Sequence, residues 1–490
     1  MRRSGILLPV SSIPSKYGIG SFSKECYEFV DFLKKANQKL WQILPLGPTG
    51  YGDSPYQSFS TFAGNPYFID LEELIEKGFL TEEECNALSY GNDEACVDYA
   101  EVYNSRKVLL KKAYERSNIK ADEGFQKFVS ENAYWLDDYA LYMAVKDDLG
   151  GSSWTSWDAD IKMRKPEILT AYKEKLQKEI ECYQFQQYYF QKQWLKLKKY
   201  ANDNGIEIIG DIPIYVSLDS ADAWANPQLF QLDENCNPKA VAGCPPDAFS
   251  ATGQLWGNPL YTWEYHKETD YDWWVKRIGY CFQLYDVVRI DHFRGFDEYY
   301  SIPYGEETAM NGHWEKGPGM SLFNTLKEKL GDRPIIAEDL GFLTDTVIQL
   351  VKDTGYPGMK IVQFGFDSRE ESDYQPHTYT RNSVVYTGTH DNDTTKHWFD
   401  VLDSVDKKMA VDYMNLKDDS DACDEMIRLA YAAVCDTCVI PMQDFLELGE
   451  EARINTPSTL GKNWTWRMKA DACSDELAAR IAELVRIYKR

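Results

Sequence analysis

The sequence predicts an α/β protein whose core is a (β/α)8 TIM barrel with large, mainly helical insertions between its strands. Eight short apolar runs, many of them rich in Val and Ile, alternate with amphipathic helical stretches along the 490 residues. Strands that alternate with helices build parallel sheets, and eight such units close into a barrel. A doubly wound open sheet is the alternative, but it usually carries a glycine-rich phosphate loop, and the nearest match, at residues 18–20, lacks the third glycine.

The predicted strands are the apolar runs themselves. They cover residues 5–10, 40–46, 206–216, 287–293, 334–340, 359–366, 383–391 and 438–448. Helical periodicity separates most of them. The predicted helices between and after them cover residues 25–35, 273–283, 321–330, 344–353, 422–434 and 474–488.

Two long segments interrupt this alternation. Residues 217–286 form an insertion before the fourth strand. No linker rich in Pro, Gly or Ser flanks the longer segment, so residues 1–490 are predicted to form a single catalytic domain. The longer segment, residues 67–205, is a mainly helical insertion between the second and third strands, with helices expected at residues 71–77, 101–116, 125–129, 136–149 and 167–201.

The composition favours a neutral, sugar-like substrate over nucleic acid or a membrane surface. The net charge is −25, whereas phosphate binding needs clustered Lys and Arg. The chain has 33 Tyr, 22 Phe and 14 Trp. Many of these belong in the core, but this many Tyr and Trp also suit a surface that stacks on the flat apolar faces of sugars. We therefore expect no nucleic-acid partner and no membrane partner.

Cysteine use and the N-terminus favour the cytoplasm. The chain has 11 Cys, an odd number, scattered along its length, which suits free thiols in a reducing compartment. Cys435 and Cys438 form a lone C-x-x-C, for which two packed core thiols are a simpler interpretation than zinc or redox chemistry. The apolar run at residues 6–8 is too short for a signal peptide or a membrane span, and no long apolar stretch follows it.

Two loops rich in Gly, Pro and aromatic residues are predicted to face a ligand. Residues 49–66 combine turn residues with four aromatic side chains, and aromatic residues in such a loop are less often core residues than those at helical spacing. Residues 243–258, here called the lid loop, are stiffened at Pro245 and Pro246 and carry Phe249 and Trp256. The lid loop is therefore predicted to cover the barrel mouth, with an ordinary surface loop as the alternative.

The fourth predicted strand carries the first candidate site residue. Side chains on a strand alternate between faces, so Arg289 and Asp291 point the same way. A guanidinium this close favours the ionised carboxylate, which predicts a lowered pKa for Asp291. An ionised, positioned carboxylate is what covalent attack on a sugar carbon requires. For this stretch alone, a purely structural ion pair is the alternative.

Two more carboxylates end the fifth and seventh predicted strands, so all three would meet at the C-terminal mouth of the barrel. Glu338 follows three apolar residues without an adjacent cation, so burial is predicted to raise its pKa and keep it protonated, as a general acid must be. Asp391, beside His390 and Asp393, could bind sugar hydroxyls and stabilise positive charge. Glycosidic chemistry is the prediction; a metal at His390 and Asp391 stays open, although no second closely spaced His pair is present.

Sequence motifs at seven places span almost the whole chain. They are residues 51–57 (Tyr-Gly-Asp-Ser-Pro-Tyr-Gln), 210–216 (Gly-Asp-Ile-Pro-Ile-Tyr-Val), 243–247 with 253–259, 289–295 (Arg-Ile-Asp-His-Phe-Arg-Gly), 337–341 (Ala-Glu-Asp-Leu-Gly), 387–394 (Thr-Gly-Thr-His-Asp-Asn-Asp-Thr) and 453–459 with 463–464. In this order they resemble the 4-alpha-glucanotransferases of glycoside hydrolase family 77, also called amylomaltases or disproportionating enzymes, which are related to the α-amylases.

The resemblance implies a barrel without a separate C-terminal β domain, and neither a metal nor an organic cofactor. It implies Asp291 as the nucleophile, Glu338 as the general acid/base and Asp391 as the stabiliser of the transition state, in agreement with the roles inferred from their surroundings. It further implies that the substrate-binding residues are Ser54, Tyr56, Asp211, Trp256, Arg289, His390 and Asn463. The residues of the lid are then Pro245, Pro246, Asp247 and Phe249. Two departures are Ala248, where the family often has Tyr, and Ser458, where Gly is common; the first could alter the grip on an acceptor.

The expected reaction is a retaining transfer. A segment of an α-1,4-glucan would move to the 4-hydroxyl of another glucan, or of glucose, through a covalent glucosyl-aspartate. The expected partners are therefore α-1,4-glucans and maltooligosaccharides. Two alternatives remain, a hydrolase that uses the same residues with water as the acceptor, and a catalytically inactive glucan-binding protein.

Overall fold

The structure is a computed structural model that describes residues 2–50, 52–246, 250–341, 343–369, 372 and 374–490. Its centre is a sheet of eight parallel strands in the order β10-β11-β12-β1-β2-β3-β6-β9. The outer strands β9 and β10 are brought together by a hydrogen bond from the Ala337 N–H to the Pro357 carbonyl (3.0 Å), so the sheet forms a nearly closed barrel. The strands are β1 (Arg3–Leu7), β2 (Leu40–Gln42), β3 (Glu207–Pro213), β6 (Val287–Asp291), β9 (Ile335–Ala337), β10 (Gly358–Ile361), β11 (Ser383–Tyr386) and β12 (Thr437–Pro441).

The predicted (β/α)8 barrel is confirmed, and each predicted strand contains or overlaps an observed one. Most strand residues are buried, as expected where helices cover a parallel sheet. The predicted strands are longer than the observed ones because the apolar residues after a strand are still buried. Ile43 and Leu44 lie in the loop after β2, and Met442 and Phe445 belong to the short helix α17 (Met442–Phe445), yet all four are at most 5% exposed.

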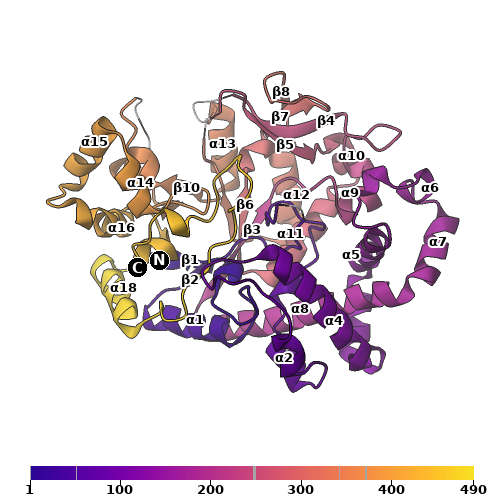
Figure 1. The fold of residues 1–490 in the computed structure, drawn as a ribbon. Helices are drawn as coiled ribbons and strands as arrows, with labels where there is room; N and C mark the ends of the chain where they lie inside the picture. The colour runs from indigo at the N-terminus through magenta and orange to yellow at the C-terminus, as the bar shows by residue number, and fades with distance from the viewer. Residues whose placement is uncertain (1, 51, 247–249, 342, 370–371, 373) are drawn as a thin grey trace.

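Helices surround the barrel, as the periodicity predicts. They are α1 (Lys24–Lys35), α8 (Gln177–Asp203), α11 (Asp272–Leu284), α12 (Met320–Leu330), α13 (Asp345–Thr354), α16 (Ala422–Ala432) and α18 (Asp475–Tyr488). Local capping sets their ends. In α13 the Thr344 side chain accepts from the Val347 N–H, and Gly355, with φ 73°, ends the helix in the left-handed conformation. Both termini lie beside α18 (Figure 1), where the Arg2 guanidinium donates to the Tyr488 carbonyl at 3.0 Å.

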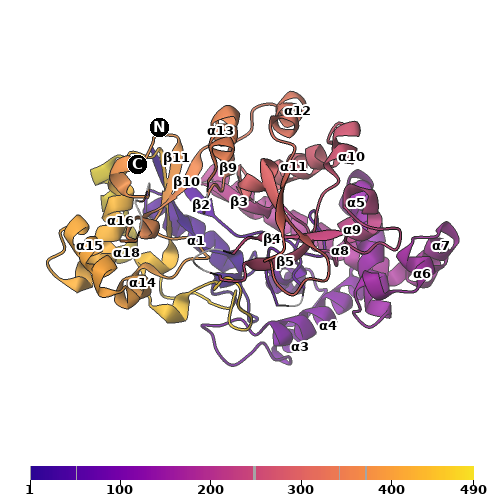
Figure 2. The ribbon, with the colours of Figure 1, turned by 90° about the horizontal axis from the view of Figure 1, so that it is seen from above.

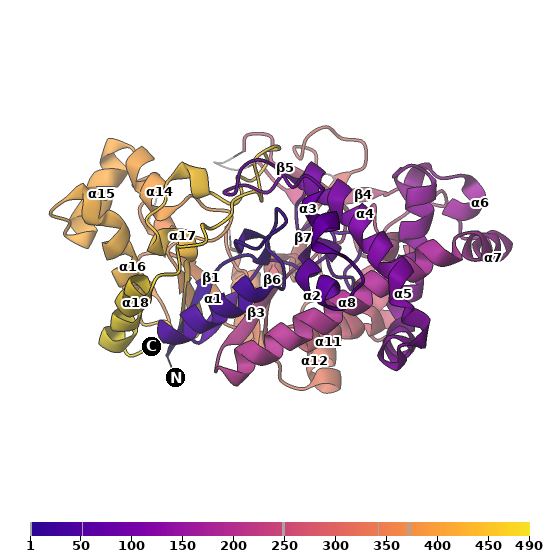
Figure 3. The ribbon, with the colours of Figure 1, turned by 60° about the horizontal axis from the view of Figure 1, so that its bottom comes forward.

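The segment between β2 and β3 is helical, and its helices lie on one side of the barrel, opposite α14–α16 and α18 (Figures 1 and 2). Two helices predicted at 125–129 and 136–149 are one, α5, within which the Asn132 side chain donates to the Phe128 carbonyl and accepts from the Trp135 indole. The helix predicted at 167–201 is instead two, α7 and α8, which separate at Leu176. This segment contains α2 (Leu71–Glu76), α3 (Glu82–Asn86), α4 (Tyr99–Ser117), α5 (Glu123–Asp148), α6 (Ala159–Lys162), α7 (Pro166–Lys175) and α8, which leads back beneath the barrel next to α1 (Figure 3).

A second sheet, which the sequence did not predict, follows the C-terminal ends of β3 and β6. Its four strands are antiparallel in the order β5-β4-β7-β8. The prediction that residues 243–258 form a loop is wrong at both ends, because β4 and β5 pair with each other and β4 also pairs with β7. Asp247, Ala248 and Phe249 lie outside the described residues. The strands are β4 (Ala240–Cys244), β5 (Gln254–Pro259), β7 (Glu298–Pro303) and β8 (His313–Lys316).

The remaining helices are short or lie near the C-terminal strands. They are α9 (Ala221–Ala225), α10 (Trp263–Glu268), α14 (Thr395–Val401) and α15 (Ser404–Met414). In the part of the chain that the structure describes, every helix is too short or too polar to span a bilayer.

Candidate active site

The three candidate carboxylates follow strands of the same parallel barrel. Asp291 is the last residue of β6, Glu338 comes directly after β9, and Asp391 follows β11 by five residues. Because the carboxyl ends of parallel barrel strands share one rim, these side chains come to the same mouth. Asp211 and Arg289 lie opposite each other in the paired strands β3 and β6, just below that rim.

Arg289 connects Asp291 to Asp211. Its Nη1 donates to the two carboxylate oxygens of Asp211 at 2.8 and 2.7 Å and lies 3.1 Å from Asp291 Oδ1. The predicted contact between Arg289 and Asp291 is therefore present. The predicted direction of the pKa shift is wrong, because burial raises the pKa of Asp291 to about 6. The charges of Asp211 and Asp391 also raise it, and the attraction of Arg289 offsets these influences only in part. Asp291 is still ionised at neutral pH.

Glu338 is held by two backbone N–H groups. His292 donates to its Oε2 at 2.6 Å and Leu340 donates to its Oε1 at 3.1 Å. Burial raises the pKa of Glu338 to about 8 and the charge of Asp291 adds to this, while Arg289 and the two N–H groups act in the opposite direction. The predicted rise is confirmed. Since His292 directly follows Asp291, the hydrogen bond places the Glu338 carboxyl one peptide unit from the Asp291 backbone.

The pKa of Asp391 is shifted in the opposite direction to that of Glu338. Its Oδ2 lies 3.2 Å from His390 Nε2, and its Oδ1 accepts from Asn455 Nδ2 at 2.6 Å. Burial raises the pKa of Asp391, but His390 and Asn455 outweigh it and bring the pKa well below its usual range. The sequence interpretation did not assign Asn455 a role, although it lies within the motif at residues 453–459. Its backbone N–H also donates to the His390 carbonyl at 3.1 Å, which fixes both residues.

Tyr56 joins these pairs into one network. Its hydroxyl donates to Asp211 Oδ2 at 2.7 Å and lies 2.8 Å from His390 Nε2. The Tyr56 ring stacks on the imidazole of His390 with centroids 5.2 Å apart and planes 16° apart, and Trp464 packs against both rings. The loop at residues 49–66 thus reaches the strand ends, as predicted for a ligand-facing loop.

Asp211→Ala should lower the free energy of unfolding by about 3–5 kcal/mol, because it leaves the Arg289 guanidinium buried without its main partner. Both side chains are at most 2% exposed. Chemical denaturation measures the loss. Glu28→Ala, which removes an exposed ion pair with Lys24, is the control and should change little. A loss below about 1 kcal/mol for Asp211→Ala would contradict a central role for this pair.

The other predicted residues lie at different distances from the network. Trp256, on β5, packs edge-to-face on His292, with centroids 4.8 Å apart. Ser54 Oγ accepts from the Tyr56 N–H at 3.3 Å, so it shapes the loop that presents Tyr56. The Asn463 amide is used inside its own loop, where it accepts from the Thr456 N–H and donates to the Thr459 carbonyl, and the structure does not bring it to the three carboxylates.

Other residues that the sequence analysis singled out lie outside this network. Ser458 has φ 64°, the left-handed backbone for which Gly is better suited, and this explains why Gly is common there. Pro245 and Pro246 follow directly on β4. Cys435 and Cys438 are buried free thiols. Among the described residues, no group of three or more His, Cys, Asp or Glu side chains is arranged to hold a metal ion.

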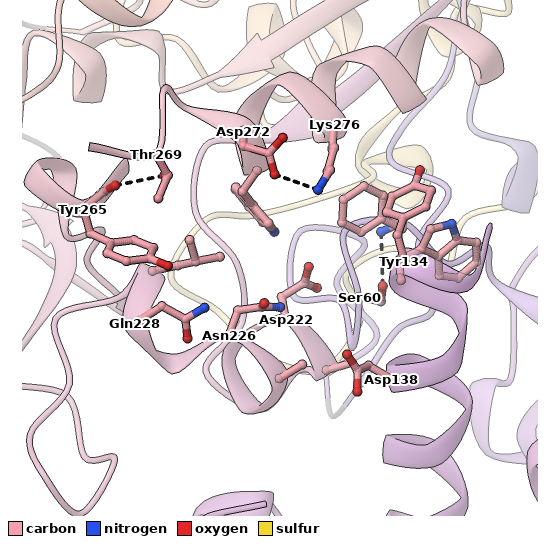
Figure 4. Close-up of a pocket in the computed structure, with 16 residues that line it drawn as sticks. Ser60, Tyr134, Asp138, Asp222, Asn226, Gln228, Tyr265, Thr269, Asp272 and Lys276 are labelled. Atoms are coloured by element: carbon pink, nitrogen blue, oxygen red, sulfur yellow. Dashed lines mark hydrogen bonds and ion pairs between the residues drawn. The ribbon is translucent and has the colours of Figure 1, made fainter. Parts of the chain in front are cut away.

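Two of the concavities along the loop at residues 49–66 are also lined by helices of the segment between β2 and β3. A cleft of 1210 Å³ is lined by this loop, by Leu460 and by tyrosines of α4, α5 and α8. A smaller cavity of 170 Å³ lies between α5, α9, α10 and α11 (Figure 4). Asp222 lines the smaller cavity and accepts from the Thr61 N–H and hydroxyl, both at 2.8 Å. The wall of this cavity therefore anchors the base of the loop that carries Tyr56.

The (β/α)8 barrel carries three carboxylates with different pKa values and a buried arginine at its C-terminal mouth. This arrangement is that of an enzyme that acts on glycosidic bonds. The family model described as 4-alpha-glucanotransferase, glycoside hydrolase family 77, matches residues 8–473. The chain belongs to this family.

Close relatives agree over the full length. A 4-alpha-glucanotransferase from Clostridium butyricum is 53% identical over 483 residues, which cover 98% of this chain and 99% of that protein. A 4-alpha-glucanotransferase from Streptococcus pneumoniae is 50% identical over 492 residues, covering 100% and 97%. The solved structure of amylomaltase from Streptococcus agalactiae in complex with acarbose has a TM-score of 0.97 and 44% identity, and the match covers 100% of both chains.

Proposed function

We propose that Asp291 and Glu338 carry out a retaining transfer of α-1,4-glucan segments. The observation that carries this proposal is the hydrogen bond that holds the Glu338 carboxyl at the N–H of His292, the residue directly after Asp291, with the Glu338 pKa raised above neutrality and the Asp291 pKa below it. Retaining enzymes hold their two carboxyls about 5–5.5 Å apart, close enough for direct attack, whereas inverting enzymes leave room for a water between them. A Glu338 carboxyl that is hydrogen-bonded to the residue next to Asp291 fits the shorter carboxyl separation of retaining enzymes.

In the first step, Glu338 gives its proton to the glycosidic oxygen of the donor. An ionised oxygen of Asp291 attacks the anomeric carbon, the glycosidic bond breaks, and the cleaved part of the glucan leaves with the proton. The product is a glucosyl ester of Asp291. Positive charge on the reacting carbon is stabilised by Asp391, whose carboxylate is kept ionised by His390 and Asn455.

In the second step, the carboxylate of Glu338 accepts the proton of an acceptor 4-hydroxyl. The hydroxyl oxygen attacks the anomeric carbon and displaces Asp291, which restores the α configuration after two inversions. Arg289 holds Asp291 in place as it gains and loses the ester. Tyr56, Asp211, His390 and Trp256 are proposed to contact the bound glucan, because they line the mouth around the carboxylates.

Membership in a transferase family favours a sugar over water as the acceptor. The acceptor is proposed to be another α-1,4-glucan, a maltooligosaccharide or glucose. We further propose that residues 1–490 act as one catalytic unit, with residues 67–205 and 217–286 as insertions around the mouth. The eleven cysteines are free thiols, which supports a reducing, cytoplasmic location.

Maltotriose alone tests the proposed function. Transfer between two maltotriose molecules should produce glucose with maltopentaose, or maltose with maltotetraose, and repeated transfers should produce longer chains, because the acceptor hydroxyl resolves the ester. Chromatography of the products over time distinguishes the outcomes. Short products alone would mean that water is the acceptor, and no products would mean an inactive binding protein.

A bell-shaped dependence of kcat/KM on pH is expected for maltotriose. Asp291 must be ionised, so activity should fall as the pH drops through the raised pKa of about 6. Glu338 must be protonated, so activity should fall again as the pH rises through about 8. Because the two carboxyls interact, each limb belongs to the pair. Activity that still increases above about pH 9 would contradict the acid role of Glu338.

A further inference from the structure

His292, directly after Asp291, has a backbone conformation that side chains rarely adopt. Its φ is 51° and its ψ is 49°, in the left-handed region. Such strain persists only where the surroundings enforce it, and it concentrates at functional sites. Here this residue's N–H donates to Glu338 Oε2 at 2.6 Å, the shorter of the two backbone bonds that hold that carboxyl.

The imidazole of His292 lies against two aromatic rings. Trp256 of β5 meets it edge-to-face with centroids 4.8 Å apart, and the buried Tyr215 ring lies 6.4 Å away. On another side stands Gly295, where an added Cβ would lie 3.4 Å from His292 Cδ2 and only 2.8 Å from Ile214. Among the described residues, His292 Nε2 is buried without a hydrogen-bond partner. Burial, with Arg294 adding to it, lowers the pKa of His292 to about 3, so the ring is neutral at working pH.

We propose that His292 is a positioning residue that connects Trp256, on the β4–β5 hairpin, to the carboxyl group of Glu338. The side chain packs on the hairpin while the backbone of the same residue holds the acid, so movement of Trp256 is passed to the Glu338 hydrogen bond. This inference rests on the proposed function, in which Glu338 is the acid/base. It assigns the hairpin a part in tuning the acid.

The groups that face Glu338 determine how a loss of the ring acts on it. They are the charges of Asp291 and Arg289 on β6 and the N–H groups of His292 and Leu340. Burial is the largest of the influences that raise the pKa of Glu338. Removal of the imidazole should let more water approach the carboxyl, so its burial should decrease and the pKa of Glu338 should fall toward its usual value. The basic limb of the pH profile should therefore move to lower pH.

His292→Gly is the appropriate variant, because glycine adopts the left-handed backbone without strain and keeps the N–H while it removes the ring. The basic limb of the pH profile of this variant should move to lower pH by about 0.5–1 pH unit, which is a fraction of the pKa shift that full burial can produce. Its kcat/KM at the optimum should fall about 10- to 100-fold through misplacement of the acid. Trp256→Ala should move the limb in the same direction, whereas Trp256→Phe, which keeps a ring against His292, should move the limb less.

The double variant His292→Gly/Trp256→Ala tests the connection itself. Residues that act through one contact give non-additive effects, so the basic limb of the double variant should move little further than that of the single variant with the larger shift. An unchanged basic limb in His292→Gly, or shifts of the limb that add in the double variant, would overturn the inference. Thermal unfolding of each variant verifies that the fold is retained.

The maltotriose assay on the unsubstituted enzyme separates this inference from the function on which it rests. If that enzyme makes no longer chains, the proposed function fails and the inference fails with it. If it makes them and the variants still show an unchanged limb, only the inference fails.

Discussion

Asp291→Asn should abolish glucan transfer, with kcat lowered at least about 10⁴-fold, while the enzyme still binds glucan. Removal of a nucleophile typically costs this much or more, because binding and electrostatic stabilisation alone sustain little turnover. The fold should persist, since the Arg289 guanidinium keeps its two bonds to Asp211 and the Asp291 side chain is 27% exposed.

Two measurements on Asp291→Asn separate chemistry from binding. Product formation from maltotriose gives the rate, and calorimetric titration with a long maltooligosaccharide gives the affinity. Asp272→Asn is the matched control, because it removes a carboxylate that pairs only with the exposed Lys276 on α11, and its activity should be unchanged. Full turnover in Asp291→Asn would remove this residue from the mechanism.

Glu338→Gln should lower kcat on maltotriose about 10²- to 10⁴-fold, since an amide cannot give a proton to the leaving glycosidic oxygen. A maltosyl donor with fluoride at the anomeric carbon needs no such proton. With that donor the first step should proceed, and the second should be slow because no base takes the acceptor proton. A glycosyl ester on Asp291 should therefore accumulate.

Mass spectrometry of the intact variant, followed by peptide mapping, detects this ester. The expected adduct adds the mass of one maltosyl group to the peptide that contains Asp291. The amide can still accept one of the two backbone N–H bonds at this position, so the variant should fold, and thermal unfolding verifies this. Equal activity of the variant and the unsubstituted enzyme on maltotriose would show that another group supplies the proton.

The barrel strands were predictable because most of their residues are buried and form short apolar runs, as at Ile335–Ala337. The second sheet was not predictable, because β4 is Ala-Val-Ala-Gly-Cys and β5 carries Gly257 and Pro259. β4 pairs with β5 on one side and with β7, about 60 residues further on, on the other, and pairing of this kind leaves little local pattern.

The candidate site was predictable as a set of acids at strand ends, but its fine tuning was not. The sign of the Asp291 shift depends on burial and on Asp211 and Asp391, which lie far away in the sequence. Tyr56 meets Asp211 and His390 across 155 and 334 residues. No spacing rule connects such positions, and only the closed barrel brings them together.

The pairing of the first strand with the last has a consequence for biosynthesis. Arg3–Leu7 pairs with Thr437–Pro441, so one flank of β1 stays without its partner until about 430 more residues have been translated. At about 5–20 residues per second, this delay is roughly 20–90 s. Ribosome-bound chains therefore expose an open sheet edge for that time, which makes them candidates for chaperone protection.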